Sequence, residues 1–291
     1  MDLPSTARNL SQPSESMPGN QQVGLLRKSL MLLSGSVVSQ IIPFAFLPIL
    51  ARLYSPERFA DLNLFMLVAT ILYTVGTARF DLALMLPRNP RRALNLMQLG
   101  IWGCSVVAVL TLILLLINPF SFLSALGSEW LLLPLAILIT GSCELLSYMH
   151  NRAEAYRTLS TGLVGMQLAT ALSKLLLNMK ASGLILGHCL GRFFWFVYLL
   201  FNSQFSILKL LKPPPYKYAR ALIRRYLDFP RYNVPHSILS AFSGGFLVLF
   251  LSLYSENKVA GYVSFSRTLL FAPIGMLSAS VGRVFFKEAA V

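Results

Sequence analysis

Three basic side chains lie inside long apolar stretches of the sequence, where a charged group is costly unless it has a function or a partner. Arg267, Arg192 and Lys174 each occupy such a stretch. A cation held in apolar surroundings can bind a phosphate or a carboxylate, because it replaces the water that the anion loses on entering. The chemistry that these residues indicate is therefore anion binding.

Arg267 shares one face of its predicted helix with Ala260, Ser264 and Ser278. A small and polar face that carries one cation is typical of a helix beside a water-filled cavity, and we favour this over an arginine paired with a buried carboxylate. Gln40 belongs to a similar polar face in the first apolar stretch. Ordinary hydrogen bonding between helices explains that face equally well.

Arg192 has two interpretations. His188 precedes it by one helical turn, so the two side chains share a face that could form a cationic site in a cavity. Glu144 also lies inside an apolar stretch and needs a partner, so we favour a structural ion pair between Arg192 and Glu144. Lys174 lies near a helix end, where its long side chain can reach the membrane interface, and a place in the cavity lining is the alternative.

No motif of enzymatic chemistry accompanies these residues. The sequence has no phosphate-binding loop, no nucleophile elbow, no zinc-protease motif and no paired acidic motif. Cys104, Cys143 and Cys189 lie in apolar runs, without a second Cys or His at the spacing of metal ligands. We therefore expect no enzymatic activity, no metal site and no cofactor.

The composition predicts a membrane protein. Hydrophobic residues make up 55% of the chain and charged residues only 12%, with a mean hydropathy of +0.64. A soluble domain carries about 25% charged residues. The excess of apolar residues requires a lipid-facing surface, which excludes a soluble globular protein.

We predict an all-α membrane bundle of about eight transmembrane helices, because apolar runs of the roughly 20 residues that a span requires recur along the chain. The predicted spans are 30–51, 61–78, 97–117, 130–149, 158–177, 183–201, 237–255 and 259–281. Pro43 and Pro48 predict a kink in the first span. Gly183, Gly187 and Gly191 predict a close contact between the sixth span and another helix.

The distribution of charge predicts that both termini lie in the cytoplasm. With the N-terminus inside, most of the 25 lysines and arginines fall on the cytoplasmic side. Only four fall outside, namely Arg52, Arg58, Lys180 and Lys258. The net charge of +14 is thus mainly a sign of topology, which removes most of the case for nucleic-acid binding.

Four segments follow from this pattern. Residues 1–28 are polar and predict a disordered cytoplasmic tail, and 29–201 predict a six-helix N-terminal lobe. Residues 202–236 predict a basic cytoplasmic loop, and 237–291 predict two further helices, which the family resemblance given below implies are the first two of an incomplete second lobe. Tyrosines and leucines at helical spacing in the basic loop fit a helix on the membrane surface or a solvated connector equally well.

Several motifs resemble those of a known family. The stretch Leu47–Glu57 (LPILARLYSPE) resembles the signature of Wzx-type bacterial flippases of the polysaccharide transporter family. Ala78–Pro87 (ARFDLALMLP) and Phe229–Pro235 (FPRYNVP) are similar to later motifs of that family, as is the stretch from Val259 to Phe286. These matches occur in the order of the family.

The resemblance implies a two-lobed bundle like those of the multidrug/oligosaccharidyl-lipid/polysaccharide superfamily. It implies a flippase of the bacterial inner membrane, which moves undecaprenyl-pyrophosphate-linked oligosaccharide by alternating access for lipopolysaccharide (O-antigen), capsule or exopolysaccharide biosynthesis. A polysaccharide polymerase and a chain-length regulator are the partners it implies. Carried over by motif, Arg52, Arg79 and Arg267 would contact the pyrophosphate.

Length departs from this family pattern, because about four helices expected after Val291 are missing. Two alternatives to an active flippase therefore stay open. One is a drug or cation antiporter of the same superfamily, which would use a carboxylate in its cavity. The other is a truncated membrane protein that does not transport.

Overall fold

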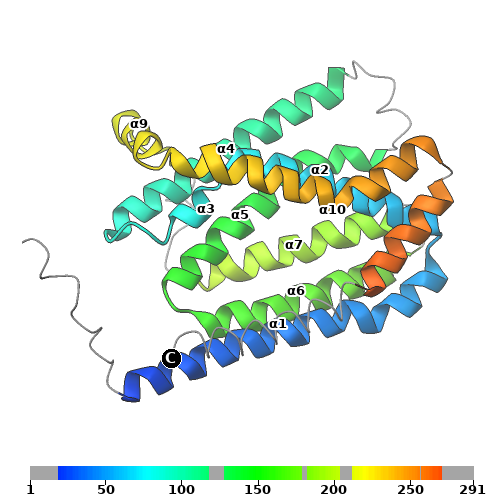
Figure 1. The fold of residues 1–291 in the computed structure, drawn as a ribbon, viewed down its shortest axis with the longest axis horizontal. Coiled ribbons are helices and arrows are strands. Elements are labelled where there is room, and N and C mark those ends of the chain that lie inside the picture. The colour runs from blue at the N-terminus through cyan, green and yellow to red at the C-terminus, as the bar shows by residue number, and fades with distance from the viewer. Residues whose placement is uncertain (1–18, 118–127, 179–181, 204–211, 256, 271–291) are drawn as a thin grey trace, which may run out of the picture.

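The computed structural model describes residues 19–117, 128–178, 182–203, 212–255 and 257–270, which form a bundle of helices without a strand (Figure 1). In chain order these are α1 (Gly19–Leu53), α2 (Pro56–Thr77), α3 (Phe80–Ala83), α4 (Pro90–Ile117), the 3₁₀ turn η3 (Ser128–Leu132), α5 (Leu133–Arg152), α6 (Tyr156–Leu176), α7 (Gly183–Phe201), α9 (Tyr216–Arg225), the π-helical turn η4 (Phe229–Asn233), α10 (Val234–Tyr254) and a helix at 257–270. The predicted all-α class is confirmed for this part of the chain.

Within the described residues, six helical segments are long and apolar enough to cross a membrane. They are Gly35–Leu53, Pro56–Thr77, Pro90–Ile117, Glu129–Arg152, Gly183–Phe201 and Phe229–Tyr254. The protein is therefore a multi-pass membrane protein, while the count of eight spans and the orientation stay predictions. Helix α6 coincides with the fifth predicted span but is less apolar, because it contains Gln167, Thr170 and Lys174. These three residues line a cavity described below.

One predicted boundary differs from the structure. Helix α1 begins at Gly19, so residues 19–28 are helical although we expected a disordered tail there. No proline interrupts the chain between Gly19 and Pro43, and the helix extends back from its apolar part. Pro43 and Pro48 both lie inside α1, and a kink at these residues stays a prediction.

The bundle has two ends, which differ in the elements they carry. We call the end that holds α3, α9 and the α5–α6 connection the α3 end, at the left in Figure 1. The opposite end holds the tight turn between α1 and α2, and we call it the Tyr54 end. The two larger buried apolar clusters lie at the two ends, around Leu96 and Leu145 near α3 and around Phe65 and Ile137 near Tyr54.

Helices α6 and α7 are in close contact along the predicted glycine stripe. A Cβ atom at Gly187 would lie 2.6 Å from Cγ of Lys174 and 2.8 Å from its backbone nitrogen. A Cβ atom at Gly191 would lie closer still to Thr170, and one at Gly183 closer still to Leu177. The close helix contact predicted for this stripe is confirmed, and it holds α7 against the polar part of α6.

Candidate functional site

A cavity of about 270 Å³ lies inside the bundle, between α1, α2, α6, α7 and the helix at 257–270. Its polar lining consists of Asn63, Gln167, Thr170, Lys174, His188, Arg192 and Thr268. The remaining wall is apolar and includes Phe46, Phe59 and Met66. A polar strip inside an apolar bundle can hold a ligand with a charged head and an apolar remainder.

Local packing brings the three basic side chains of the cavity together. His188 and Arg192 are one turn apart on α7, and Lys174 comes from α6 beside Gly187. The Tyr54 hydroxyl donates a hydrogen bond of 2.6 Å to the backbone carbonyl of Lys174. This bond fixes the turn between α1 and α2 against α6, next to Lys174.

The cavity has a positive electrostatic character. Among the described residues that line it, none is Asp or Glu, and no described carboxylate lies within ion-pair distance of Lys174. Arg192 is balanced in part, because its Nη1 atom lies 3.8 Å from Oε1 of Glu144 on α5. The described residues hold no group of three His, Cys, Asp or Glu that could bind a metal ion. The arrangement therefore fits an anion.

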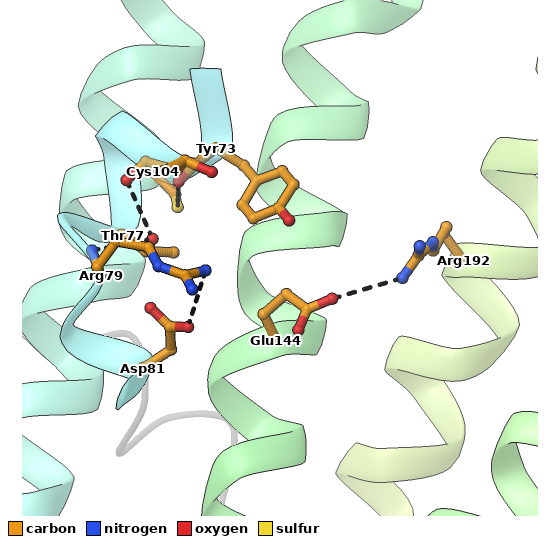
Figure 2. Close-up of polar contacts among 8 residues, drawn as sticks. Tyr73, Thr77, Arg79, Asp81, Cys104, Glu144 and Arg192 are labelled. Atoms are coloured by element: carbon orange, nitrogen blue, oxygen red, sulfur yellow. Dashed lines mark hydrogen bonds and ion pairs between the residues drawn. The ribbon is translucent and has the colours of Figure 1, made fainter. Parts of the chain in front are cut away.

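Glu144 belongs to a row of charges that continues away from the cavity. Figure 2 shows Glu144 between Arg192 on α7 and the pair of Arg79 and Asp81, which follow α2. Nη1 of Arg79 lies 3.4 Å from Oδ2 of Asp81, a carboxylate only 2% exposed. Two cations and two carboxylates thus offset one another in the interior, where unpaired charges would be costly.

The turn that carries Arg79 is strained. Ala78 and Arg79 both have left-handed backbone conformations, with φ angles of 49° and 54°. Such residues cost about 1 kcal/mol or more each unless they are glycine. The two residues end α2 and reverse the chain into α3, which places Asp81 beside the guanidinium of Arg79.

Burial raises the pKa of Asp81 above its ordinary value, and the nearby Arg79 opposes this shift only in part. The folded protein therefore binds this proton more tightly than the unfolded chain does. The free energy of unfolding should consequently fall as the pH rises through the range above about 4, where an ordinary aspartate ionises.

We expect Asp81→Asn to flatten this pH dependence, because the amide keeps the shape of the side chain without the ionisation. Thermal unfolding of the detergent-solubilised protein between about pH 4 and pH 7 measures the effect. Asp228→Asn, at an exposed position of the same end, is the matched control. Equal slopes for wild type and Asp81→Asn would contradict the prediction.

The structure does not bring Arg52, Arg79 and Arg267 together. Arg52 is exposed at the end of α1, whereas Arg79 follows the far end of α2. Because α2 has 22 residues, its two ends lie about 33 Å apart. Arg267 borders a neighbouring cavity of about 220 Å³, which shares Asn63 and Thr268 with the first. In this conformation one pyrophosphate cannot reach both Arg52 and Arg79.

The other predicted lining residues divide into two groups. Lys174, His188 and Arg192 line the main cavity. Gln40 is half-buried on α1, and it is not among the residues that line either of these two cavities. Ser264 also stays outside both linings, because it is 1% exposed and faces the helix contact that buries Ala260.

Asn63 and Tyr54 contribute to the site but were not predicted from the sequence. Asn63 lines both cavities, and a polar residue within an apolar stretch was the signal that could have identified it. Tyr54 gave no such signal, because its partner is a backbone carbonyl 120 residues away.

Comparison with known proteins adds one match. The family model described as polysaccharide biosynthesis protein matches residues 25–286, which include every described helix from most of α1 onward. No curated protein and no solved structure matches the sequence significantly.

Proposed function

We propose that this chain, which belongs to the polysaccharide biosynthesis protein family, moves a polyprenyl-pyrophosphate-linked oligosaccharide across the bacterial inner membrane. The observation that carries the proposal is the cavity lined by Lys174, His188 and Arg192 inside a membrane bundle. The pyrophosphate is the charged part of such a substrate, and hydrocarbon cannot solvate it. Basic side chains in the cavity can replace its lost hydration.

The roles of the cavity residues follow from their chemistry. Arg192 offers a planar set of donors that fits two phosphate oxygens, and Lys174 adds a mobile point charge. Glu144 competes with the substrate for Arg192, so the substrate can bind and leave without an irreversibly tight contact. Alternating exposure of the cavity to the two membrane sides would complete transport, without bond formation, metal or cofactor.

The orientation and the partners belong to the same proposal. Exposed basic residues at the α3 end, among them Arg88, Arg91 and Arg92, support a cytoplasmic location of that end. A polysaccharide polymerase and a chain-length regulator would use the translocated substrate for O-antigen, capsule or exopolysaccharide. A cation antiporter fits the cavity less well, because Glu144 is paired with Arg192 and is not part of the lining.

Reconstitution of the full chain in liposomes tests this function. A polyprenyl-pyrophosphate-linked oligosaccharide added to the membrane should reach the opposite leaflet faster than in protein-free liposomes, as measured by its accessibility to an added glycosidase. We expect Lys174→Gln to slow the transfer about tenfold or more, because a hydrogen bond to a charged group contributes about 1.5–3 kcal/mol.

Lys258→Gln is the matched control, since Lys258 is exposed and does not line the cavity. It should leave the rate of transfer unchanged. A wild-type rate equal to that of protein-free liposomes would contradict the proposed function and would favour a membrane protein without transport activity.

A further inference from the structure

Helix α9 lies across the α3 end of the bundle. Figure 1 draws α9 nearly end-on, whereas the long helices run across the page. Leu222 and Tyr226 are 6% and 7% exposed and belong to the apolar cluster of this end, so they fix the position of α9. The candidate span Phe229–Tyr254 begins just after α9 ends. Because the long helices cross the membrane, α9 lies at its surface and along its plane.

The outer side of α9 combines an apolar stripe with a row of cations, which together we call the α9 patch. Tyr216 and Ile223 are exposed, and their spacing of seven residues places them on one stripe of α9. Leu227, in the turn that follows α9, is exposed as well. Lys217, Arg220 and Arg224 are also exposed, and their spacing of three and four residues places them side by side along the helix. This combination is typical of helices in the membrane interface, where apolar groups enter the acyl boundary and cations meet phosphates.

The charge around α9 is strongly one-sided. Between residues 212 and 232 the basic residues are Lys212, Lys217, Arg220, Arg224, Arg225 and Arg231. Asp228 is the one acidic residue of this segment. We propose that the α9 patch binds the headgroups of anionic phospholipids and so holds α9 and the start of α10 on the bilayer.

The apolar stripe distinguishes an anionic lipid surface from other negatively charged partners. A nucleic acid or an acidic protein would engage the cations but would leave Ile223 and Leu227 in water, and a solvated connector would gain nothing from exposing them. A lipid surface satisfies both parts of the patch at once. The inference is independent of the transported substrate, because none of these residues lines the cavity.

A fluorescent reporter on the full chain tests the proposal. A bimane label on Tyr216→Cys can be attached selectively, because the native cysteines are at most 8% exposed. In nanodiscs we expect a shift to shorter emission wavelength when phosphatidylglycerol is added to phosphatidylcholine. The shift should disappear at about 1 M salt, where the screening length falls to about 3 Å.

The triple variant Lys217→Gln, Arg220→Gln and Arg224→Gln should lose this response. Each basic residue near an anionic surface contributes about a fivefold preference, so loss of three corresponds to about a hundredfold. Arg88→Gln, Arg91→Gln and Arg92→Gln remove the same charge from exposed positions of the same end and should keep the response.

Three outcomes would overturn the proposal: a shift that does not depend on phosphatidylglycerol, a triple variant that keeps it, or a control triple that loses it equally. A response to RNA or to soluble acidic protein, without one to phosphatidylglycerol, would assign the patch to that class of partner instead. If the triple variant does not fold, the single variants should give a graded loss.

Discussion

Replacement of Arg192 by alanine is expected to lower the free energy of unfolding by about 2–3 kcal/mol, because it leaves Glu144 without its cation inside the bundle. The loss should be smaller than for a fully buried ion pair, since the side chains of Arg192 and Glu144 are 26% and 34% exposed. Glu144→Gln in the same chain should restore most of the stability, because it removes the carboxylate that was left unpaired.

Transport should respond differently from stability. The double variant Arg192→Ala with Glu144→Gln should unfold near the wild-type temperature and yet fail to move the lipid-linked oligosaccharide, since the cavity has lost its planar cation. Thermal unfolding and liposome transfer, measured on the same preparations, separate the two effects. Transport at the wild-type rate by the stable double variant would remove Arg192 from the anion site.

The pair of Arg58 and Glu129 provides a comparison for the stability effect. Its atoms are 3.4 Å apart, and the side chains of Arg58 and Glu129 are 37% and 11% exposed. Arg58 lies in the first turn of α2, at the end of a candidate span where water can reach the pair. An ion pair in contact with water contributes about 0–1 kcal/mol, so Arg58→Ala should change stability less than Arg192→Ala. Equal effects would mean that the surroundings of Glu144 are as well hydrated as those of Glu129.

The sequence was sufficient to predict the charged residues of the site that lie in apolar stretches, because a charge there is costly unless it has a partner or a function. Glu144 and Arg192 were each expected to need a partner, and they lie 3.8 Å apart in the structure. Lys174 was expected to reach the membrane interface, with the cavity lining as the alternative, and His188 was identified because it shares a helix face with Arg192. Both line the cavity. This argument is local, since it needs only the residue type and the apolar run around it.

Which end of the bundle a residue occupies could not be derived from motifs alone. The resemblance implied that Arg52, Arg79 and Arg267 all contact the pyrophosphate, because all three lie in family motifs. A motif carries no information about the distance between its members, and α2 separates the first two arginines by its whole length. The role of Tyr54 was also beyond the sequence, because it depends on a backbone carbonyl of another helix.

In two segments the polarity of the residues was not sufficient to predict the conformation. Residues 19–28 are polar, which indicated disorder, but they continue the helix that the apolar run begins. The basic loop allowed two interpretations, and the structure places α9 in it because Leu222 and Tyr226 pack into the apolar cluster. For α9 an adjoining apolar surface decides the conformation, and a property averaged over the segment does not include that surface.

Reversal of charge at Arg267 is expected to reduce transport by about three orders of magnitude. A glutamate beside the cavities would repel the pyrophosphate, and two like charges about 4 Å apart cost about 4 kcal/mol at an effective dielectric constant of about 20. Arg267 borders the cavity that shares Asn63 and Thr268 with the main one, so its charge acts close to the bound headgroup.

Arg52→Glu makes the same change of charge at an exposed position outside both cavity linings, so transport should stay near the wild-type rate. Liposome transfer at matched protein content compares the two variants, and the unfolding temperature of each shows whether the fold is intact. Near-normal transport by Arg267→Glu would exclude that arginine from the headgroup site. A loss at Arg52→Glu as large as that at Arg267→Glu would mean that the headgroup also contacts the Tyr54 end during transfer.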